Sequence, residues 1–143
     1  MLLPLPISLV QEISLENHMA LALMRSGRGT SATMCVMLRI LYMLFYMLEG
    51  DYRDIDIPRF LEMEAALDKS IREANSGRGW RFDEQSFPVI ASVLLRFDEV
   101  VGTVPASVYH ESAEKMARFA RSASQSPIPG SRVCDMWLIG GES

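Results

Sequence analysis

Residues 31–49 read SATMCVMLRILYMLFYMLE, and this stretch decides the fold. Apolar side chains occur on every side of a helix built from it, and Arg39 is its one charge before Glu49. A helix that is apolar all round belongs at the centre of a bundle. The apolar run from Ala32 to Leu48 is shorter than the roughly 20 residues that cross a bilayer. We therefore predict a buried helix over Ser31–Glu49.

Three proline-containing phrases of one pattern mark helix starts further along the chain. In each, a residue with a capping side chain precedes an apolar residue and then a proline: Asp56-Ile57-Pro58, Ser86-Phe87-Pro88 and Thr103-Val104-Pro105. The capping oxygen can accept from an unpaired backbone N–H, and proline in the first turn costs no helical hydrogen bond. Ser8 with Gln11 has the spacing of a capping box and indicates a fourth start. The helices predicted from these starts cover Leu9–Arg25 with a break near Ser14, Ile57–Asn75, Phe87–Val101 and Val104–Ala123.

Apolar residues recur at helical spacing in each of these segments. In the segment from Ile57 to Asn75, one face carries Phe60, Met63, Leu67, Ile71 and Ala74. Such a stripe is typical of a helix packed on a core. The sequence therefore predicts an all-α protein, a single compact bundle of about five helices with a largely irregular C-terminal tail. We place the bundle domain at residues 1–124 and the Pro- and Gly-containing tail at 125–143.

The composition limits the classes of function. The chain has 143 residues, 49% of them hydrophobic and 22% charged, which is typical of one globular domain. The net charge of −4, whose excess lies in residues 54–103, argues against a protein that grips duplex DNA through its phosphates. Cys35 and Cys134 lie far apart and form no metal-ligand pattern, so we expect no metal, no cofactor and a reducing cytoplasmic setting.

Arg39, Tyr42 and Tyr46 lie at positions i, i+3 and i+7 of the central helix and share a face. One interpretation is a cleft in which a guanidinium and two phenols receive an anion or the acidic group of a partner. The other is an edge stripe, in which Arg39 pairs with a carboxylate from a neighbouring helix and both phenols reach water. The second interpretation is the one we favour from the sequence.

The tetrapeptide Ser-Gly-Arg-Gly occurs twice, at residues 26–29 and 76–79, and each copy joins two predicted helices. One hypothesis is that Arg28 and Arg78, with Trp80 next to the second loop, contact a nucleic-acid backbone and stack on a base. The alternative is two ordinary solvated loops, with Trp80 anchoring a helix start. The acidic total charge favours the alternative.

Six of the ten methionines fall in the first two predicted helices: Met19, Met24, Met34, Met37, Met43 and Met47. Methionine-rich faces can form adaptable binding grooves, but methionines more often fill gaps in a core. Cys35, inside the apolar run, is predicted to be a buried and inert thiol. His18 and His110 show no metal-helix spacing and are expected to lie at the surface or at helix caps.

Four phrases resemble a loosely defined group of small proteobacterial proteins of mobile elements, labelled Fis-family regulators. They are Leu3-Pro4-Leu5-Pro6, Leu15-Glu16-Asn17-His18-Met19-Ala20-Leu21, Leu38-Arg39-Ile40-Leu41-Tyr42 and Glu64-Ala65-Ala66-Leu67-Asp68. The resemblance implies DNA-linked regulation. A Fis-type module ends in a helix-turn-helix with a basic recognition helix, whereas the last predicted helix here mixes basic residues with Glu111 and Glu114. No functional residue is transferred from the group to this chain.

These observations predict a small, cytoplasmic, non-enzymatic binding or regulatory protein that engages another protein through its methionine-rich first two helices or its acidic middle segment. The resemblance alone implies a role in a mobile element, which includes inhibiting or modulating a host nucleoprotein complex. Two alternatives stay open: a nucleic-acid-binding regulator that uses the arginine loops, and a small helical enzyme acting on an anionic metabolite. Another protein is the first expected partner and nucleic acid the second, no membrane is expected, and a homodimer is among the oligomeric states left open. The candidate partner-binding residues are Arg28, Arg39, Tyr42, Tyr46, Arg78 and Trp80.

Overall fold

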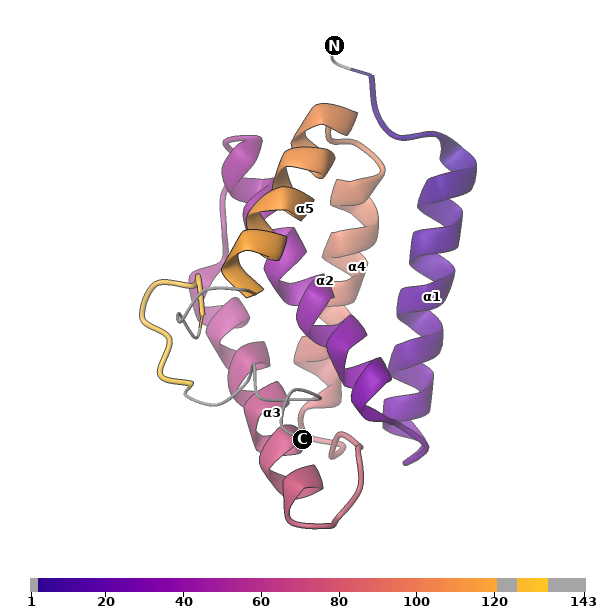
Figure 1. Ribbon diagram of the computed structural model, residues 1–143, viewed down its shortest axis with the longest axis vertical. Coiled ribbons are helices and arrows are strands. Elements are labelled where there is room, and N and C mark those ends of the chain that lie inside the picture. Colours follow the sequence, from indigo (N-terminus) through magenta and orange to yellow (C-terminus); the bar gives the residue numbers. More distant parts are fainter. Residues whose placement is uncertain (1–2, 121–125, 134–143) are drawn as a thin grey trace.

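The computed structural model describes residues 3–120 and 126–133 and consists of five helices (Figure 1). They are α1 (Ile7–Arg25), α2 (Ser31–Gly50), α3 (Ile57–Asn75), α4 (Phe87–Val101) and α5 (Ala106–Ala120). Within these residues no strand forms beyond two isolated bridges, Pro4 with Pro105 and Gly29 with Trp80. The predicted all-α bundle is therefore confirmed, and the division into two domains stays a prediction.

The observed helix ends agree closely with those predicted for α2, α3 and α4. Helix α1 begins at Ile7, two residues early, and runs through Ser14 without the predicted break. Helix α5 begins at Ala106, because the Pro4–Pro105 bridge and a 2.8 Å hydrogen bond from the Ala106 N–H to the Leu3 carbonyl keep Pro105 outside the helix. The predicted end of that helix, at Ala123, lies outside the described residues.

The proline phrases mark helix starts correctly, but only one of the three capping assignments is right. The Asp56 carboxylate accepts from the Arg59 N–H at 3.3 Å, as predicted. Ser86 makes no side-chain cap, because its own N–H donates at 2.9 Å to Asp83, whose carboxylate closes that turn. Thr103 caps nothing in α5, because its hydroxyl donates back to the last carbonyls of α4.

The first two helix starts also differ from the sequence prediction. Helix α1 follows Pro6 with no side-chain cap, so the predicted Ser8–Gln11 capping box is wrong. Helix α2 begins with a capping box formed by Thr30 and Thr33. The sequence pattern did not predict it, because the third residue of the helix is a threonine where the usual box has Glu or Gln. The Thr30 hydroxyl accepts from the Thr33 N–H at 3.2 Å, and the Thr33 hydroxyl accepts from the Thr30 N–H at 2.8 Å.

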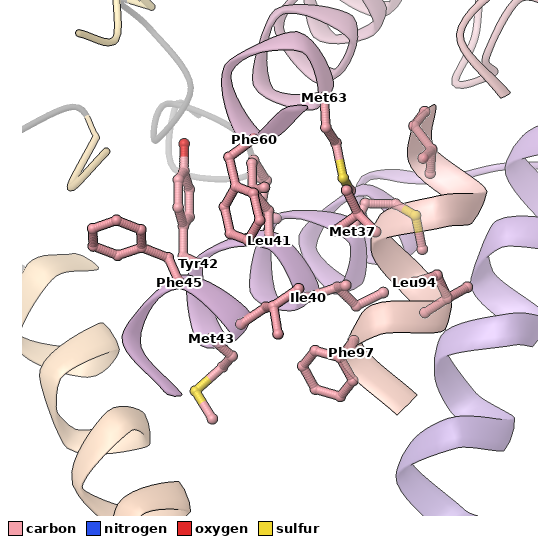
Figure 2. Close-up of a cluster of buried hydrophobic side chains, with 14 of the residues drawn as sticks. Met37, Ile40, Leu41, Tyr42, Met43, Phe45, Phe60, Met63, Leu94 and Phe97 are labelled. Carbon is pink, nitrogen blue, oxygen red and sulfur yellow. The ribbon is translucent and has the colours of Figure 1, made fainter. Parts of the chain in front are cut away.

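Helix α2 lies at the centre of the bundle and packs against all four other helices (Figure 1). Figure 2 shows its side chains between those of α3, represented by Phe60 and Met63, and those of α4, represented by Leu94 and Phe97. By length and composition α2 could cross a membrane, but 67% of its most apolar window is buried inside the bundle. The predicted role of residues 31–49 as a core helix is thus confirmed.

Candidate functional site

An apolar groove of about 420 Å³ runs between α1 and α2 and is open to solvent. The wall from α1 consists mainly of Leu15, Met19 and Leu23, whose side chains are 62%, 56% and 37% exposed. Ala32 and Val36 of α2 form the opposite wall. Contiguous exposed apolar surface with a concave shape is the usual mark of an interaction site on a soluble domain.

The groove exists because α1 is apolar on two faces. One face, which includes Ala20, Leu21 and Met24, is buried against the bundle. Leu15, Met19 and Leu23 follow one another at i+4 spacing and form a second stripe beside the first. A helix at the edge of a five-helix bundle can bury only one face, so the second stripe remains exposed.

Charged side chains line one side of this groove. Glu12 and Glu16 belong to its α1 wall. The Arg39 guanidinium of α2 donates to the Glu16 carboxylate at 3.0 Å and links the two helices. The groove therefore combines an apolar floor with acidic side chains, one of which is already paired. This combination favours an occupant that is apolar on one face and basic at its edges.

The prediction that Arg39, Tyr42 and Tyr46 form one cleft is wrong. Because α2 is surrounded by other helices, positions only 60° apart on its circumference face different neighbours. Arg39 bonds to Glu16 of α1, whereas the Tyr42 hydroxyl donates to Glu64 of α3. The favoured edge-stripe interpretation is right for Arg39 and wrong for Tyr42, which is 0% exposed and does not reach water.

Tyr46 is half-buried and packs edge-on against Phe45, with ring centroids 5.6 Å apart. Burial raises the pKa of Tyr46, and the Glu49 carboxylate raises it further. Burial likewise raises the pKa of Tyr42, with the nearby Glu64 carboxylate as the second cause. Both phenols are thus poor acids, and neither faces the α1–α2 groove.

A buried carboxylate that the sequence analysis missed lies on the far side of α2. Glu64 is 1% exposed and accepts hydrogen bonds from three hydroxyl groups. The donors are Tyr42 and, at 2.5 Å each, Ser126 and Ser131. These bonds hold the segment 126–133 on the bundle, with Ile128 buried beneath it. The apolar residues further along the tail, 134–139, lie outside the described residues.

The sequence did contain a signal for Glu64. It falls four residues after Phe60 and three before Leu67, so it lies on the apolar face that the periodicity identified. Asn17 is a similar case, because it is three residues before Ala20 and is 1% exposed. A polar residue at a core position of an amphipathic stripe should have been treated as a candidate in its own right.

The structure brings together the two arginine loops that the sequence analysis singled out. Gly29 and Trp80 pair in an antiparallel bridge, so Arg28 and Arg78 lie on adjoining loops at one end of the bundle (lower end of Figure 1). Trp80 is partly buried against the core and partly exposed. It lies in the loop between α3 and α4 and not at a helix start, where the alternative interpretation had placed it.

Five of the six methionines of α1 and α2 are core residues: Met24, Met34, Met37, Met43 and Met47. Only Met19 lines the groove, so the groove's apolar character comes mainly from leucine, alanine and valine. Cys35 is exposed, contrary to the predicted buried thiol, because its position on α2 points away from the neighbouring helices. Partial burial still raises the pKa of Cys35, an effect that Arg39 opposes.

The two histidines show no metal-binding arrangement. His18 of α1 bonds through Nε2 to an Asp98 carboxylate oxygen of α4 at 2.7 Å and ties these helices together. His110 packs its ring against Tyr109. Among residues 3–120 and 126–133, no three His, Cys, Asp or Glu side chains gather as a metal-binding group.

Comparison with known proteins finds no protein-family model and no curated protein that matches the sequence, and no solved structure that matches the fold.

Proposed function

We propose that this protein is a non-enzymatic binding module that holds an amphipathic helix of a partner protein in the α1–α2 groove. The observation that supports this most is the exposed apolar stripe of Leu15, Met19 and Leu23 beside Ala32 and Val36. A partner helix would fill the groove with apolar residues at i, i+4 and i+7, as in other helix-in-groove complexes. Lysine or arginine at the edge of that helix would face Glu12 and Glu16.

The acidic middle of the chain is a weaker candidate for the partner surface. Six of its ten carboxylates already have basic internal partners: Asp56 pairs with Arg59, Asp68 with Arg72, Asp83 with Lys69, Glu84 with Arg25, Asp98 with His18 and Glu99 with Arg96. Surface pairs of this kind contribute little to stability, but they reduce the charge available to a basic partner. The groove therefore carries the proposal, and a mobile-element role remains a prediction from the sequence resemblance.

A defined peptide tests the groove directly. The probe is a fluorescent 18-residue helix with leucine on one face and lysine on the other, and its binding to the full chain is measured by fluorescence anisotropy. Burying the exposed half of Met19 is worth about 1 kcal/mol, so Met19→Gln should weaken binding roughly fivefold. Leu15→Gln combined with Met19→Gln should weaken it roughly thirtyfold.

Leu95 provides the matched control, because it is a single apolar side chain on α4 that is 63% exposed. Leu95→Gln should leave peptide affinity unchanged. Equal weakening by Leu95→Gln, or equal affinity for a leucine–glutamate helix, would contradict the proposal. Sedimentation of the chain without peptide tests whether the groove instead holds a second copy of this chain. A dimer that Met19→Gln converts to a monomer would show this and overturn the proposal of a different partner protein.

A further inference from the structure

The two Ser-Gly-Arg-Gly loops have the same backbone geometry. In each loop the arginine N–H donates to a carbonyl in the last turn of the preceding helix, Arg28 to Leu23 and Arg78 to Glu73, both at 2.9 Å. In each loop the glycine before the arginine has a positive φ, which is the Schellman ending of a helix. Arg28 and Arg78 thus occupy equivalent positions immediately after α1 and α3.

The bridge between Gly29 and Trp80 then joins these two loops into one surface. The approach is close enough that a Cβ on Gly29 would lie 2.5 Å from the Trp80 carbonyl oxygen. Arg28 comes directly before Gly29 and Arg81 directly after Trp80, so the bridge places the two arginines on adjoining segments. Three arginines of the two loops, Arg28, Arg78 and Arg81, are therefore brought to one end of the bundle, and all three are exposed.

This arginine end is not neutralised from within the described part of the chain. In residues 3–120 and 126–133, Arg28, Arg78 and Arg81 form no ion pair. The nearby Asp83 is held by Lys69 at 2.8 Å, and Glu84 lies 3.8 Å from Arg25, a fourth arginine at this end. Like charges that gather without acidic partners repel one another and gain nothing for folding, so their placement here points to an external anion.

We propose that the arginine end, defined by Arg28, Arg78 and Arg81 with Trp80, binds the phosphate backbone of single-stranded nucleic acid. Guanidinium groups bind phosphate oxygens through paired N–H donors. Trp80 is partly exposed and lies between Arg78 and Arg81 in the sequence, so an unpaired base at this end of the bundle can stack on it. The patch is confined to two loops of a chain with net charge −4. A flexible single strand can bend to keep its phosphates on this small patch. A rigid duplex would extend beyond the patch, and its further phosphates would lie against acidic surface and be repelled.

The test measures anisotropy of fluorescein-labelled oligo(dT) and oligo(U) of 20 nucleotides with the full chain over a range of salt concentrations. Three phosphate contacts predict a slope of about −2 in log affinity against log salt, since each contact on a single strand contributes about −0.7. Arg28→Ala, Arg78→Ala and Arg81→Ala should each reduce that slope by about 0.7. Absence of binding at low salt, or slopes unchanged in all three variants, overturns the proposal.

Arg59→Ala is the charge-matched control, because Arg59 is exposed and lies in the first turn of α3, at the opposite end of that helix from the loop. Arg59→Ala should leave the salt slope unchanged. A reduction equal to that of the loop variants would show that only the net charge of the chain matters and would overturn the proposal. A labelled polyglutamate peptide that binds while oligo(dT) does not would make the ligand an acidic protein and overturn the assignment. The double groove variant Leu15→Gln with Met19→Gln should bind oligo(dT) normally, which separates this proposal from the proposed function.

Trp80 also gives a direct spectroscopic readout. The chain has two tryptophans, so the Trp137→Phe background leaves Trp80 as the sole emitter. Saturation with oligo(dT) should quench its fluorescence, because a stacked base is in direct contact with the indole. Unchanged emission at saturation overturns the stacking part of the proposal.

Discussion

Glu64 is the polar centre on which the packing of the described tail segment depends. Its carboxylate is 1% exposed and accepts from the fully buried Tyr42 and from Ser126 and Ser131. A hydrogen bond to a charged group contributes about 1.5–3 kcal/mol, and a buried donor left without an acceptor costs about 1–3 kcal/mol. Tyr42→Phe should therefore lower the free energy of unfolding by about 2 kcal/mol. Glu64→Gln should lower it by about 2–3 kcal/mol, because an amide offers fewer acceptor sites to the three hydroxyls.

The double variant makes the test specific to the contact between the two side chains. Because one change removes the donor and the other removes the charge of the acceptor in the same hydrogen bond, Tyr42→Phe with Glu64→Gln should cost at least 1 kcal/mol less than the sum of the single changes. The measurement is urea unfolding at pH 7 followed by far-ultraviolet circular dichroism, with the slope m compared among variants. Tyr109→Phe, on the half-buried face of α5, is the control and should change stability by less than about 0.5 kcal/mol. Strict additivity of the two changes would refute the reasoning.

Two further predictions concern the arginine end and the turn beside it. Gly29→Ala should destabilise the protein by about 1–3 kcal/mol, because the new Cβ would meet the Trp80 carbonyl, whereas Gly102→Ala meets only ordinary contacts and should be neutral in the same urea assay. The Lys69 ammonium and the Ser86 hydroxyl and N–H lower the pKa of Asp83 to about 2. Because this pKa is below that of the unfolded chain, Asp83 contributes stability above about pH 4, which is lost as the pH falls toward 2. Asp83→Asn should flatten the fall of the urea midpoint across that window, and an equally steep fall in the variant would contradict this.

The α1–α2 groove shows how far sequence periodicity can identify a surface. The spacing predicted both helices, and the composition predicted that α2 would be central. Neither the spacing nor the composition revealed that α1 leaves a second apolar stripe exposed. A helical pattern alone cannot tell which of two adjacent apolar faces a neighbouring helix will cover. The sequence therefore placed the binding surface on the methionine-rich first two helices or on the acidic middle segment. It also favoured the methionines as core residues, and the bundle does bury five of those six.

The repeated tetrapeptide shows the opposite case. A shared Ser-Gly-Arg-Gly phrase after two helices predicted equivalent loops, and both do end their helices in the same way. Their contact through Gly29 and Trp80 is a long-range pairing across 51 positions of the chain. No local pattern encodes that pairing, because it depends on α1 and α3 ending at the same end of the bundle.

The amino-acid sequence alone determined the elements of this protein: five helices, where each begins and where the first four end to within a few residues, and which helix lies at the centre. These features follow from local physics, namely proline in first turns, glycine at helix ends and the 3.6-residue period of apolar side chains. Only the tertiary structure decided which side chains meet. It separated Arg39 from Tyr42, joined Tyr42 to Glu64 and paired Gly29 with Trp80, because contacts between helices depend on how the bundle closes and not on spacing along any one helix.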